Sequence, residues 1–514
     1  MTASLRALLE HGVATGPDTV VLEDAADTLT WAALHERACG VAAALVRDGV
    51  APQDRVVFIG RNDVRYFDVL FGCALAGAVL VPLNWRLHAR DLLAVVEDCG
   101  ATVVVVDDAG AQALAPVADA LAVVVSLDAH PRWPELAAWR APARDPEVPA
   151  RPEDIAVQLY TSGTTGSPKG AMFANGTNVA ALLDDISVAW GFTADDVSLL
   201  TMPLFHMGGL AWALAGLARG ARGIVVRDFV PDQVLRTMRD EQVTLAFCVP
   251  TMLAALCAVP GAGDLPLALR QMVYSGAPIS PPALATAQAT LRCDFVQIYG
   301  LTEATGAFAQ LPAADHRGDA ARSGVIRSAG TPYPWVEVTV RDPESGRDVG
   351  VGGTGEILTR SRQNMVGYWN RPEETAAVLT PDGWLRTGDI GYRDGSGRIY
   401  LLDRAKDVII SGGENVYPVE VENVLAGHPD LAEVAVIGVP DPHWGETVKA
   451  VVVPRPGATP DAAAIIAWCR GHLAGFQCPT SVDLAETLPR TATGKVRKPL
   501  LRAPYWQGQD RAIH

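Results

Sequence analysis

The chain has 514 residues, 49% of them hydrophobic and 19% charged, with a formal net charge of −16. This length exceeds one hydrophobic core and predicts about two to four structural units, and the composition is that of a globular protein rather than a disordered or fibrous one. The acidic balance argues against broad binding of nucleic acid or of an anionic membrane, but it leaves room for a local basic pocket that holds a phosphorylated ligand.

The cysteines and the N-terminus indicate a cytoplasmic protein without integral membrane association. The eight cysteines form no CxxC pair, which favours reduced thiols over a disulfide framework or a zinc site. Arg6 and Glu10 lie where a signal peptide needs its apolar run. The longest apolar stretch, 71–83, is too short to span a bilayer and is interpreted as a buried helix that runs into a strand.

The first 127 residues alternate between helix and strand patterns. Thr30 precedes apolar residues at helical spacing, and Gly49 follows them, so a capped helix is expected between these two residues. Because the predicted strands are continuously apolar, parallel sheets covered by helices are favoured. The predicted elements are strands at 56–60, 103–107 and 122–127 and a helix within 63–80.

The alternation continues beyond a surface connection at 128–152 and then changes character. Short strands separated by turn residues suggest antiparallel structure from about residue 330. After Asp407 the pattern fits a small α+β domain of about 105 residues. The fold class expected is therefore multidomain α/β, with a large N-terminal domain of helix-covered sheets, a β-rich subdomain and a small mobile C-terminal domain. The elements predicted are strands at 224–229, 243–250, 271–276 and 294–300 and helices at 418–427 and 461–474.

A polar loop, YTSGTTGSPKG at 160–170, follows a predicted buried strand. Its glycines let backbone N–H groups converge on an anion, its hydroxyls add donors, and Lys169 adds a mobile positive charge, so a polyphosphate ligand is expected. The nucleotide-hydrolase P-loop fits less well, because Pro168 stands where its second glycine belongs and Gly170 where its Ser or Thr belongs. A solvated turn remains the simpler alternative.

This loop resembles the phosphate loop of the adenylate-forming enzymes, which include acyl- and aryl-CoA synthetases, adenylation domains of nonribosomal peptide synthetases and beetle luciferases. Five further segments are similar to the family's motifs and follow in the family's order. They are SGAPIS (275–280), IYGLTEATG (298–306), GWLRTGDIGYRD (383–394), LLDRAKDVIISGGENVYPVEVE (401–422) and PRTATGKVRK (489–498).

The resemblance implies a two-step reaction that uses ATP, Mg²⁺ and CoA. A carboxylate attacks the α-phosphate of ATP, and a thiol then displaces AMP from the acyl-adenylate. The resemblance implies that Lys495 cancels charge in the first step, that Glu303 is the magnesium ligand and that Thr302 contacts the α-phosphate. His206 matches the family's gate between the ATP site and the acyl tunnel, although a structural histidine is the alternative.

The resemblance also places the nucleotide. Tyr299 would stack on adenine, and Asp389 would accept both ribose hydroxyls, as a fixed carboxylate with no competing cation. Arg404 matches a second contact to ribose or phosphate. The complete nucleotide set adds Thr161, Ser162, Gly163, Thr164, Thr165, Gly166, Lys169, Gly276, Ala277, Pro278 and Gly300.

In the family a small C-terminal domain rotates about a hinge, here at Lys406. We expect an N-terminal domain at 1–403, a hinge at 404–408 and a mobile domain at 409–514. One pose would deliver Lys495 and the other would present Ser411, Gly412, Gly413 and Glu414 to the thiol. Lys498 is interpreted as an ordinary surface charge.

The acid that is activated should be hydrophobic and uncharged apart from its carboxylate. The expected pocket residues are small or apolar and include neither the aspartate that pairs with an amino acid nor a cation for a second carboxylate. Gly208 and Gly209 would leave volume, which favours a medium, long or bulky acyl group over acetate. The predicted pocket comprises Met207, Gly208, Gly209, Trp212, Val249, Ser275, Gly276, Ala304, Thr305 and Gly306.

The sequence favours an ATP-dependent acid–CoA ligase but leaves alternatives open. Activation could be followed by transfer to a carrier-protein thiol or by a luciferase-type oxygenation. From another class, the chain could be a non-catalytic nucleotide-binding scaffold. The partners expected are a carboxylic acid, ATP and CoA, with no nucleic acid; the identity of the acid and the oligomeric state, a homodimer included, stay open.

Overall fold

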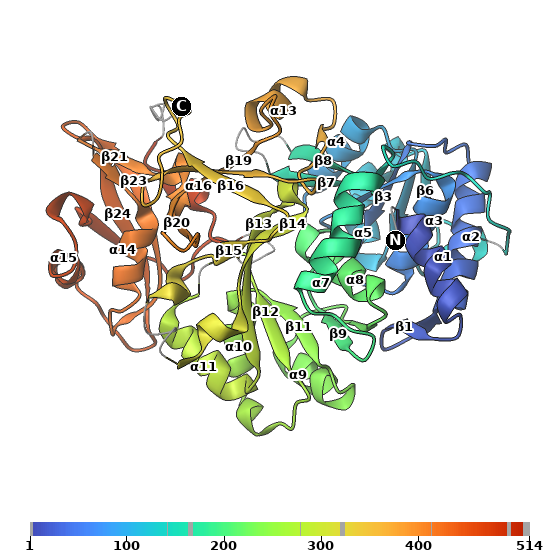
Figure 1. The fold of residues 1–514 in the computed structure, drawn as a ribbon, viewed down its shortest axis with the longest axis horizontal. Helices are drawn as coiled ribbons and strands as arrows, with labels where there is room; N and C mark the ends of the chain where they lie inside the picture. The colour runs from blue at the N-terminus through green and yellow to red at the C-terminus, as the bar shows by residue number, and fades with distance from the viewer. Residues whose placement is uncertain are drawn as a thin grey trace.

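A computed structural model of the chain describes residues 4–140, 142–162, 168–277, 279–318, 324–412, 414–490 and 495–506. Within these ranges two large sheets, a smaller antiparallel sheet and a C-terminal sheet are covered by helices. In Figure 1 the N-terminal elements, in blue and green, lie opposite the C-terminal elements, in orange and red. The expected multidomain α/β architecture is confirmed. No helix in these ranges has the length and apolar character needed to cross a bilayer.

The first large sheet has the strand order β18-β8-β7-β4-β3-β5-β6. Five of its strands run parallel, whereas β8 returns antiparallel to β7 across the glycine-rich loop. Its strands are β3 (Arg55–Ile59), β4 (Val79–Leu83), β5 (Val103–Val106), β6 (Val123–Ser126), β7 (Ile155–Ser162), β8 (Pro168–Ala174) and β18 (Gly367–Tyr368). The nearby helices are α1 (Leu5–Thr15), α2 (Trp31–Arg47), α3 (Arg65–Ala76), α4 (Ala89–Cys99), α5 (Asp108–Leu114) and α6 (Leu136–Trp139).

The second large sheet has the order β15-β14-β13-β12-β11-β9-β10-β1-β2 and is parallel except at β14, β15 and β2. Its strands are β1 (Val20–Glu23), β2 (Thr28–Thr30), β9 (Val197–Leu200), β10 (Arg222–Val225), β11 (Leu245–Cys248), β12 (Gln271–Tyr274), β13 (Asp294–Leu301), β14 (Gly306–Leu311) and β15 (Thr331–Pro332). Its helices are α7 (Ser187–Ala189), α8 (Met207–Ala218), α9 (Pro231–Asp240), α10 (Pro250–Cys257) and α11 (Pro281–Leu291). In open α/β sheets, ligands bind beyond the carboxyl ends of the parallel strands.

The third sheet is antiparallel, as the short strands after residue 330 predicted. Its strands are β16 (Glu337–Arg341), β17 (Gly355–Arg360), β19 (Leu385–Arg393) and β20 (Ile399–Arg404), with α13 (Pro372–Val378) beside them in sequence. β19 and β20 carry Asp389 and Arg404 as directly opposed residues. This sheet leads straight into the C-terminal elements.

The C-terminal elements form their own sheet and their own hydrophobic core. A separate core is what an independently packed domain requires. The elements are β21 (Ile409–Ser411), β22 (Glu414–Val416), α14 (Pro418–Leu425), β23 (Leu431–Asp441), β24 (Gly445–Pro454), α15 (Ala462–Arg470), β25 (Ser481–Leu484) and α16 (Lys498–Arg502). Pro418 is the first residue of α14, where its missing N–H costs least.

Local sequence patterns predicted the positions of the helices and strands well, but they predicted the ends of these elements less well. Thr30 caps α2 by accepting a hydrogen bond from the Ala33 N–H, as predicted. The strand expected at 224–229 instead spans Arg222–Val225, and the side chain of Arg227, beyond its end, bonds Asp63 and Asp107. The helix expected at 461–474 ends at Arg470, where the N–H of Gly471 bonds back to the last turn.

Candidate active site

The glycine-rich loop joins β7 to β8, and Thr161 lies opposite Lys169 in this hairpin. Gly163, Thr164, Thr165 and Gly166 lie outside the described residues, as do Pro278 and Gly413 and the side chain of Ser162. A Cβ at Gly170 would lie 2.5 Å from Nε2 of Gln158, so a side chain there would disturb the hairpin. The Lys169 ammonium group stands 5.6 Å from the ring centroid of Tyr368.

Glu303 sits in a single 3₁₀ turn, Thr302–Ala304, that follows β13. Its Oε1 accepts hydrogen bonds from Tyr368 Oη at 2.8 Å and from Thr161 Oγ1 at 3.5 Å. The structure therefore brings Glu303 to the strand that leads into the glycine-rich loop. Burial, reinforced by the Glu303 charge, raises the pKa of the Tyr368 hydroxyl and keeps it a donor.

This carboxylate fits the magnesium ion that the resemblance implies. Carboxylate oxygens are the hard ligands that Mg²⁺ prefers, and in nucleotide sites Mg²⁺ takes one or two carboxylates together with phosphates and water. Within the described ranges no three His, Cys, Asp or Glu side chains cluster into a metal site. A magnesium ion at Glu303 would therefore depend on the nucleotide for other ligands.

Asp389 and Tyr299 are buried and form a polar cluster with the partly exposed Arg404. Arg404 Nε lies 2.8 Å from Asp389 Oδ1, and the Tyr299 hydroxyl donates to Asp389 Oδ2 at 2.7 Å. The expectation that Asp389 has no competing cation is wrong, because the register of β19 and β20 places Arg404 opposite it. Tyr299 also packs edge-on against Phe308, with ring centroids 4.7 Å apart.

The remaining nucleotide residues border the same strands. Gly276, with φ of +90°, and Ala277 follow β12. Gly300, on β13, approaches the opposing strand so closely that a Cβ would lie 1.7 Å from the carbonyl oxygen of Gly306. Only glycine fits at that position.

Lys495, from the C-terminal domain, lies within electrostatic range of Arg404, Asp389 and Glu303. Burial lowers the pKa of its ammonium group and Arg404 lowers it further, while the two carboxylates oppose the shift. The residue is nevertheless exposed by surface area. This placement is the one that the expected Lys495-delivering pose needs, and the existence of two poses stays a prediction.

His206 caps α8, because its Nδ1 accepts a hydrogen bond from the Gly208 N–H at 3.2 Å. Burial, followed by the charge of Lys495, lowers the pKa of His206 to about 4. The imidazole is therefore neutral near pH 7. It has the structural role that was considered as the alternative, and it also lies within electrostatic range of Lys495.

The residues expected to meet the thiol lie at the turn between β21 and β22. Figure 1 shows β21 at the outer edge of the C-terminal domain, well away from β13 and β14. Gly412 has φ of +61°, and a Cβ there would lie 2.5 Å from Cε3 of Trp444. Ser411 and Glu414 face each other across the turn, and Lys406 is exposed in the 3₁₀ turn Ala405–Asp407.

The predicted acid pocket is partly assembled. A Cβ at Gly306 would lie 3.6 Å from Cγ of Met207, and one at Gly276 would lie 3.2 Å from Cγ1 of Val249, so these residues are neighbours in two pairs. Ser275 and Ala304 adjoin them along the chain, whereas Trp212 is 1% exposed within an aromatic cluster.

The glycines of α8 do not leave the volume that the sequence suggested. A Cβ at Gly209 would lie 2.2 Å from the carbonyl oxygen of Pro203, and one at Gly208 would lie 3.1 Å from Cε1 of Phe247. Gly209 is needed for close packing of the backbone, so the expectation that it leaves space for a bulky acyl group is wrong.

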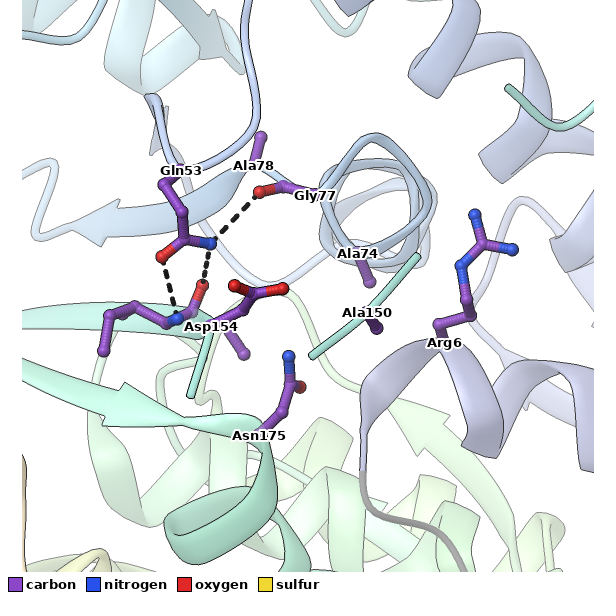
Figure 2. Close-up of a pocket in the computed structure, with 10 residues that line it drawn as sticks. Arg6, Gln53, Ala74, Gly77, Ala78, Ala150, Asp154 and Asn175 are labelled. Carbon is purple, nitrogen blue, oxygen red and sulfur yellow. Dashed lines mark hydrogen bonds between the residues drawn. The ribbon is translucent and has the colours of Figure 1, made fainter. Parts of the chain in front are cut away.

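A small cavity of about 10 Å³ lies apart from these residues, beside Arg6, Gln53 and Asn175. Figure 2 shows Gln53 spanning it, with hydrogen bonds to Gly77 and to both backbone groups of Ile155. The volume suits one water molecule and not a substrate.

Sequence reasoning missed three residues. Tyr368 and Gln363 contact the Glu303 turn, and the only signal was their position in the segment QNMVGYWN before a helix. Lys498, expected to be a surface charge, is mostly buried and lies 2.9 Å from Glu422 and 3.7 Å from Asp403.

Comparison of the sequence with known proteins identifies the family. The family model of AMP-binding enzymes matches residues 9–369, and that of the AMP-binding enzyme C-terminal domain matches residues 420–495. The chain is 40% identical to a feruloyl-CoA synthase of Amycolatopsis sp, over 95% of this chain and 96% of that protein. It is 38% identical to a fatty acid–[acyl-carrier-protein] ligase of Streptomyces coeruleorubidus, over 95% and 93%.

A solved structure shows the same fold over nearly the whole length. The crystal structure of ATP-bound MatB from Rhodopseudomonas palustris aligns with a TM-score of 0.89 and 32% identity, covering 98% of this chain and 99% of that one. The chain belongs to the AMP-binding enzymes, that is, to the adenylate-forming superfamily, and is of the acyl-CoA synthetase type.

Proposed function

We propose that this ATP-dependent acid–CoA ligase activates an acid that is hydrophobic and uncharged apart from its carboxylate. The convergence of Lys495 on Glu303, Asp389 and Arg404 carries the proposal, because it gathers the charges that an adenylation step needs. Met207 and Val249 border glycines beside this cluster and supply apolar surface for the acyl group.

In the first step a carboxylate oxygen of the acid forms a bond to the α-phosphorus of ATP, and the bond from that phosphorus to the bridging oxygen breaks. Pyrophosphate leaves with the electron pair. Lys495 offsets the negative charge that accumulates between the two anions, and Lys169 does so at the phosphates. Thr302 would contact the α-phosphate. A magnesium ion held by Glu303 would neutralise charge on the phosphates when bound.

In the second step the CoA sulfur bonds to the acyl carbonyl carbon, the bond to the AMP oxygen breaks, and the thiol proton passes to solvent. We propose that the domain at 409–514 rotates about the hinge at 404–408 between the steps, relative to the domain at 1–403. The face around Ser411, Gly412 and Glu414 would then reach the thiol. The proposed nucleotide contacts are Tyr299 for adenine and Asp389 with Arg404 for ribose.

A second acceptor has support of its own, because one relative is a ligase of fatty acid and acyl-carrier-protein. Release of pyrophosphate with a panel of hydrophobic acids, followed by thioester detection with CoA or with a carrier protein, separates the two acceptors. Thioester with CoA supports the proposal. If pyrophosphate is released but the thioester forms only with the carrier protein, the carrier protein is the acceptor in place of CoA. If the protein binds ATP without releasing pyrophosphate, it is a scaffold.

We place the enzyme in the cytoplasm. All eight cysteines fall within the described ranges and are free thiols, and most are buried. Reduced, unpaired cysteines are typical of a reducing compartment.

A further inference from the structure

The segment Gln363–Tyr368 wraps around the turn that carries Glu303. Gln363 Nε2 donates to the carbonyl oxygens of Ala304 and Ala307, each at 2.8 Å. The Met365 N–H donates to the carbonyl oxygen of Glu303 at 2.7 Å. One short segment therefore bonds to the backbone within this turn and just after it.

The turn that carries Glu303 needs these hydrogen bonds because its backbone is strained. Thr305 has φ of +54°, which is strained for a β-branched residue, and Gly306 follows with φ of +92°. A residue held in this region is strained and persists only where its surroundings fix it. The turn would relax to another shape without its hydrogen bonds, and the Glu303 carboxylate would move with it.

A buried amide network holds the strained residue. The Thr305 hydroxyl donates to the carbonyl oxygen of Gln363, and Asn178 Nδ2 donates to Thr305 Oγ1 at 3.0 Å. Asn178 and Gln363 are both fully buried. Gln363 Oε1 accepts from Trp335 Nε1 at 3.0 Å, so both ends of its amide are bonded and its orientation is fixed.

Tyr368 completes the arrangement at the carboxylate itself. β18 pairs with β8, which places Tyr368 opposite Ala171, two residues from Lys169. Its hydroxyl donates to Glu303 Oε1, while its ring lies beneath the Lys169 ammonium group. Among the described residues, both donors to this carboxylate bond Oε1 and none bonds Oε2, so Oε2 keeps its lone pairs for a cation.

We propose that Tyr368 and Gln363 are positioning residues for the metal-binding carboxylate: Gln363 fixes the turn, and Tyr368 orients Glu303 relative to Lys169. This inference rests on the proposed role of Glu303 as the magnesium ligand. Neither residue needs to touch substrate. Both act by holding one carboxylate oxygen in place so that the other faces the phosphates.

The test measures metal binding in the absence of acid, so no turnover is involved. Electron paramagnetic resonance of free Mn²⁺ gives the affinity of the enzyme·ATP complex for Mn²⁺. Tyr368→Phe keeps the ring over Lys169 and removes the hydroxyl. We expect its Mn²⁺ affinity to fall about tenfold, the usual effect of losing a hydrogen bond to a metal-ligating group. ATP binding in EDTA should stay as in the wild type.

Two further variants provide a control and a second test. Tyr392→Phe removes a hydroxyl from a tyrosine stacked on Tyr400, outside the site, and should leave Mn²⁺ affinity unchanged. Gln363→Glu replaces the donating amide nitrogen and should weaken Mn²⁺ binding by at least as much as Tyr368→Phe, with folding checked by circular dichroism. Unchanged Mn²⁺ affinity in Tyr368→Phe would overturn the inference.

The inference and the proposed function can fail separately. If the wild type releases pyrophosphate but Tyr368→Phe binds Mn²⁺ normally, only the positioning role is lost. If Glu303→Gln binds Mn²⁺ as the wild type does, the metal role of Glu303 is wrong and the inference falls with it. If the wild type binds Mn²⁺ through Glu303 and Tyr368 but activates no acid, the proposed function fails and the positioning role stands.

Discussion

At the scale of single residues, Lys495 is the group on which adenylation should depend most. It reaches the N-terminal site from the far end of the chain and meets the charges of Asp389 and Glu303 there. We expect Lys495→Ala to lower pyrophosphate release by about 100-fold or more, because one fixed charge at a developing anion has that effect. Thioester formation from supplied acyl-adenylate should stay near the wild-type rate, since the second step does not use this lysine.

The control for this variant is another lysine of the same domain. Lys449→Ala removes a lysine that lies 2.7 Å from Asp483, outside the site, and should leave both half-reactions intact. Equal losses in the two half-reactions of Lys495→Ala would contradict the division of labour between the two poses.

His206 gives a residue-scale prediction about pH. Its pKa is about 4 in the folded protein, while an unfolded histidine titrates near 6.5. Between these values the unfolded state binds a proton that the folded state lacks, so this residue makes stability fall as the pH falls through that window. We expect the Tm of His206→Asn to fall less than that of the wild type between about pH 7 and pH 5, since asparagine keeps the cap of α8.

Differential scanning fluorimetry across this range provides the measurement. His88→Asn, at an exposed position, serves as the matched control and should follow the wild-type slope. Parallel Tm curves for His206→Asn and the wild type would show that His206 is not held neutral by folding.

At the scale of elements, α16 ties the Lys495 segment to the hinge. Lys498 lies 2.9 Å from Glu422 of α14, and Asp403 at the end of β20 accepts a hydrogen bond from the Val419 N–H at 3.1 Å. Burial alone would lower the pKa of Lys498, but the carboxylates of Glu422 and Asp403 outweigh it and raise the pKa. The ammonium group is thus a buried, charged partner of two carboxylates.

Removing this ammonium group should loosen the pose that delivers Lys495. Lys498→Met keeps the stem but leaves Asp403 and Glu422 buried without their cation, and breaking such a pair typically costs several kcal/mol. We expect pyrophosphate release to fall about tenfold or more, with less effect on thioester formation from supplied acyl-adenylate. Wild-type pyrophosphate release by a correctly folded Lys498→Met would exclude the role assigned to α16.

Helices and strands could be predicted from the sequence where the interactions that form them join residues close together along the chain. Thr30 caps α2 because the cap bonds a residue three positions away, and the apolar runs of β3 and β5 reflect burial that a sequence pattern displays. The helix after Asp461 ended early because Gly471 completes its last turn, a detail that hydrophobic spacing does not contain.

The site was predictable only through its resemblance to a family. Nothing in the spacing of Glu303 and Lys495 shows that they meet, because their approach depends on how two domains dock. Tyr368 looks like an ordinary buried aromatic, and Lys498 looks like a surface charge, until the structure places each beside a carboxylate. Asp389 likewise was expected without a cation, because strand register, which sequence does not give, sets Arg404 opposite it.

At the scale of the whole molecule, the proposed function has the C-terminal domain move between the two reactions. The chain between β20 and β21 is a single 3₁₀ turn, with Lys406 as its second residue, and Arg502 anchors it through Asp407 at 2.7 Å and through the Lys406 carbonyl oxygen. The docked pose brings Lys495 near Asp389 and Glu303, while β21, which leads into the turn at Gly412, lies at the outer edge of the domain. Rotation about this short link is the means by which that turn could reach the site.

Lys406→Pro should therefore separate the half-reactions. Proline is tolerated in the first turn of a helix and fixes φ near −65°, so it should keep the docked pose while restricting rotation of the backbone. We expect pyrophosphate release near the wild-type rate and thioester formation from supplied acyl-adenylate reduced about tenfold or more, because the second pose is reached less often. Lys406→Ala removes the same side chain without fixing φ and should impair neither step. Rapid-quench measurement of both half-reactions tests this prediction. An unimpaired second step in Lys406→Pro would mean that the domain rotates about another position or does not need to rotate.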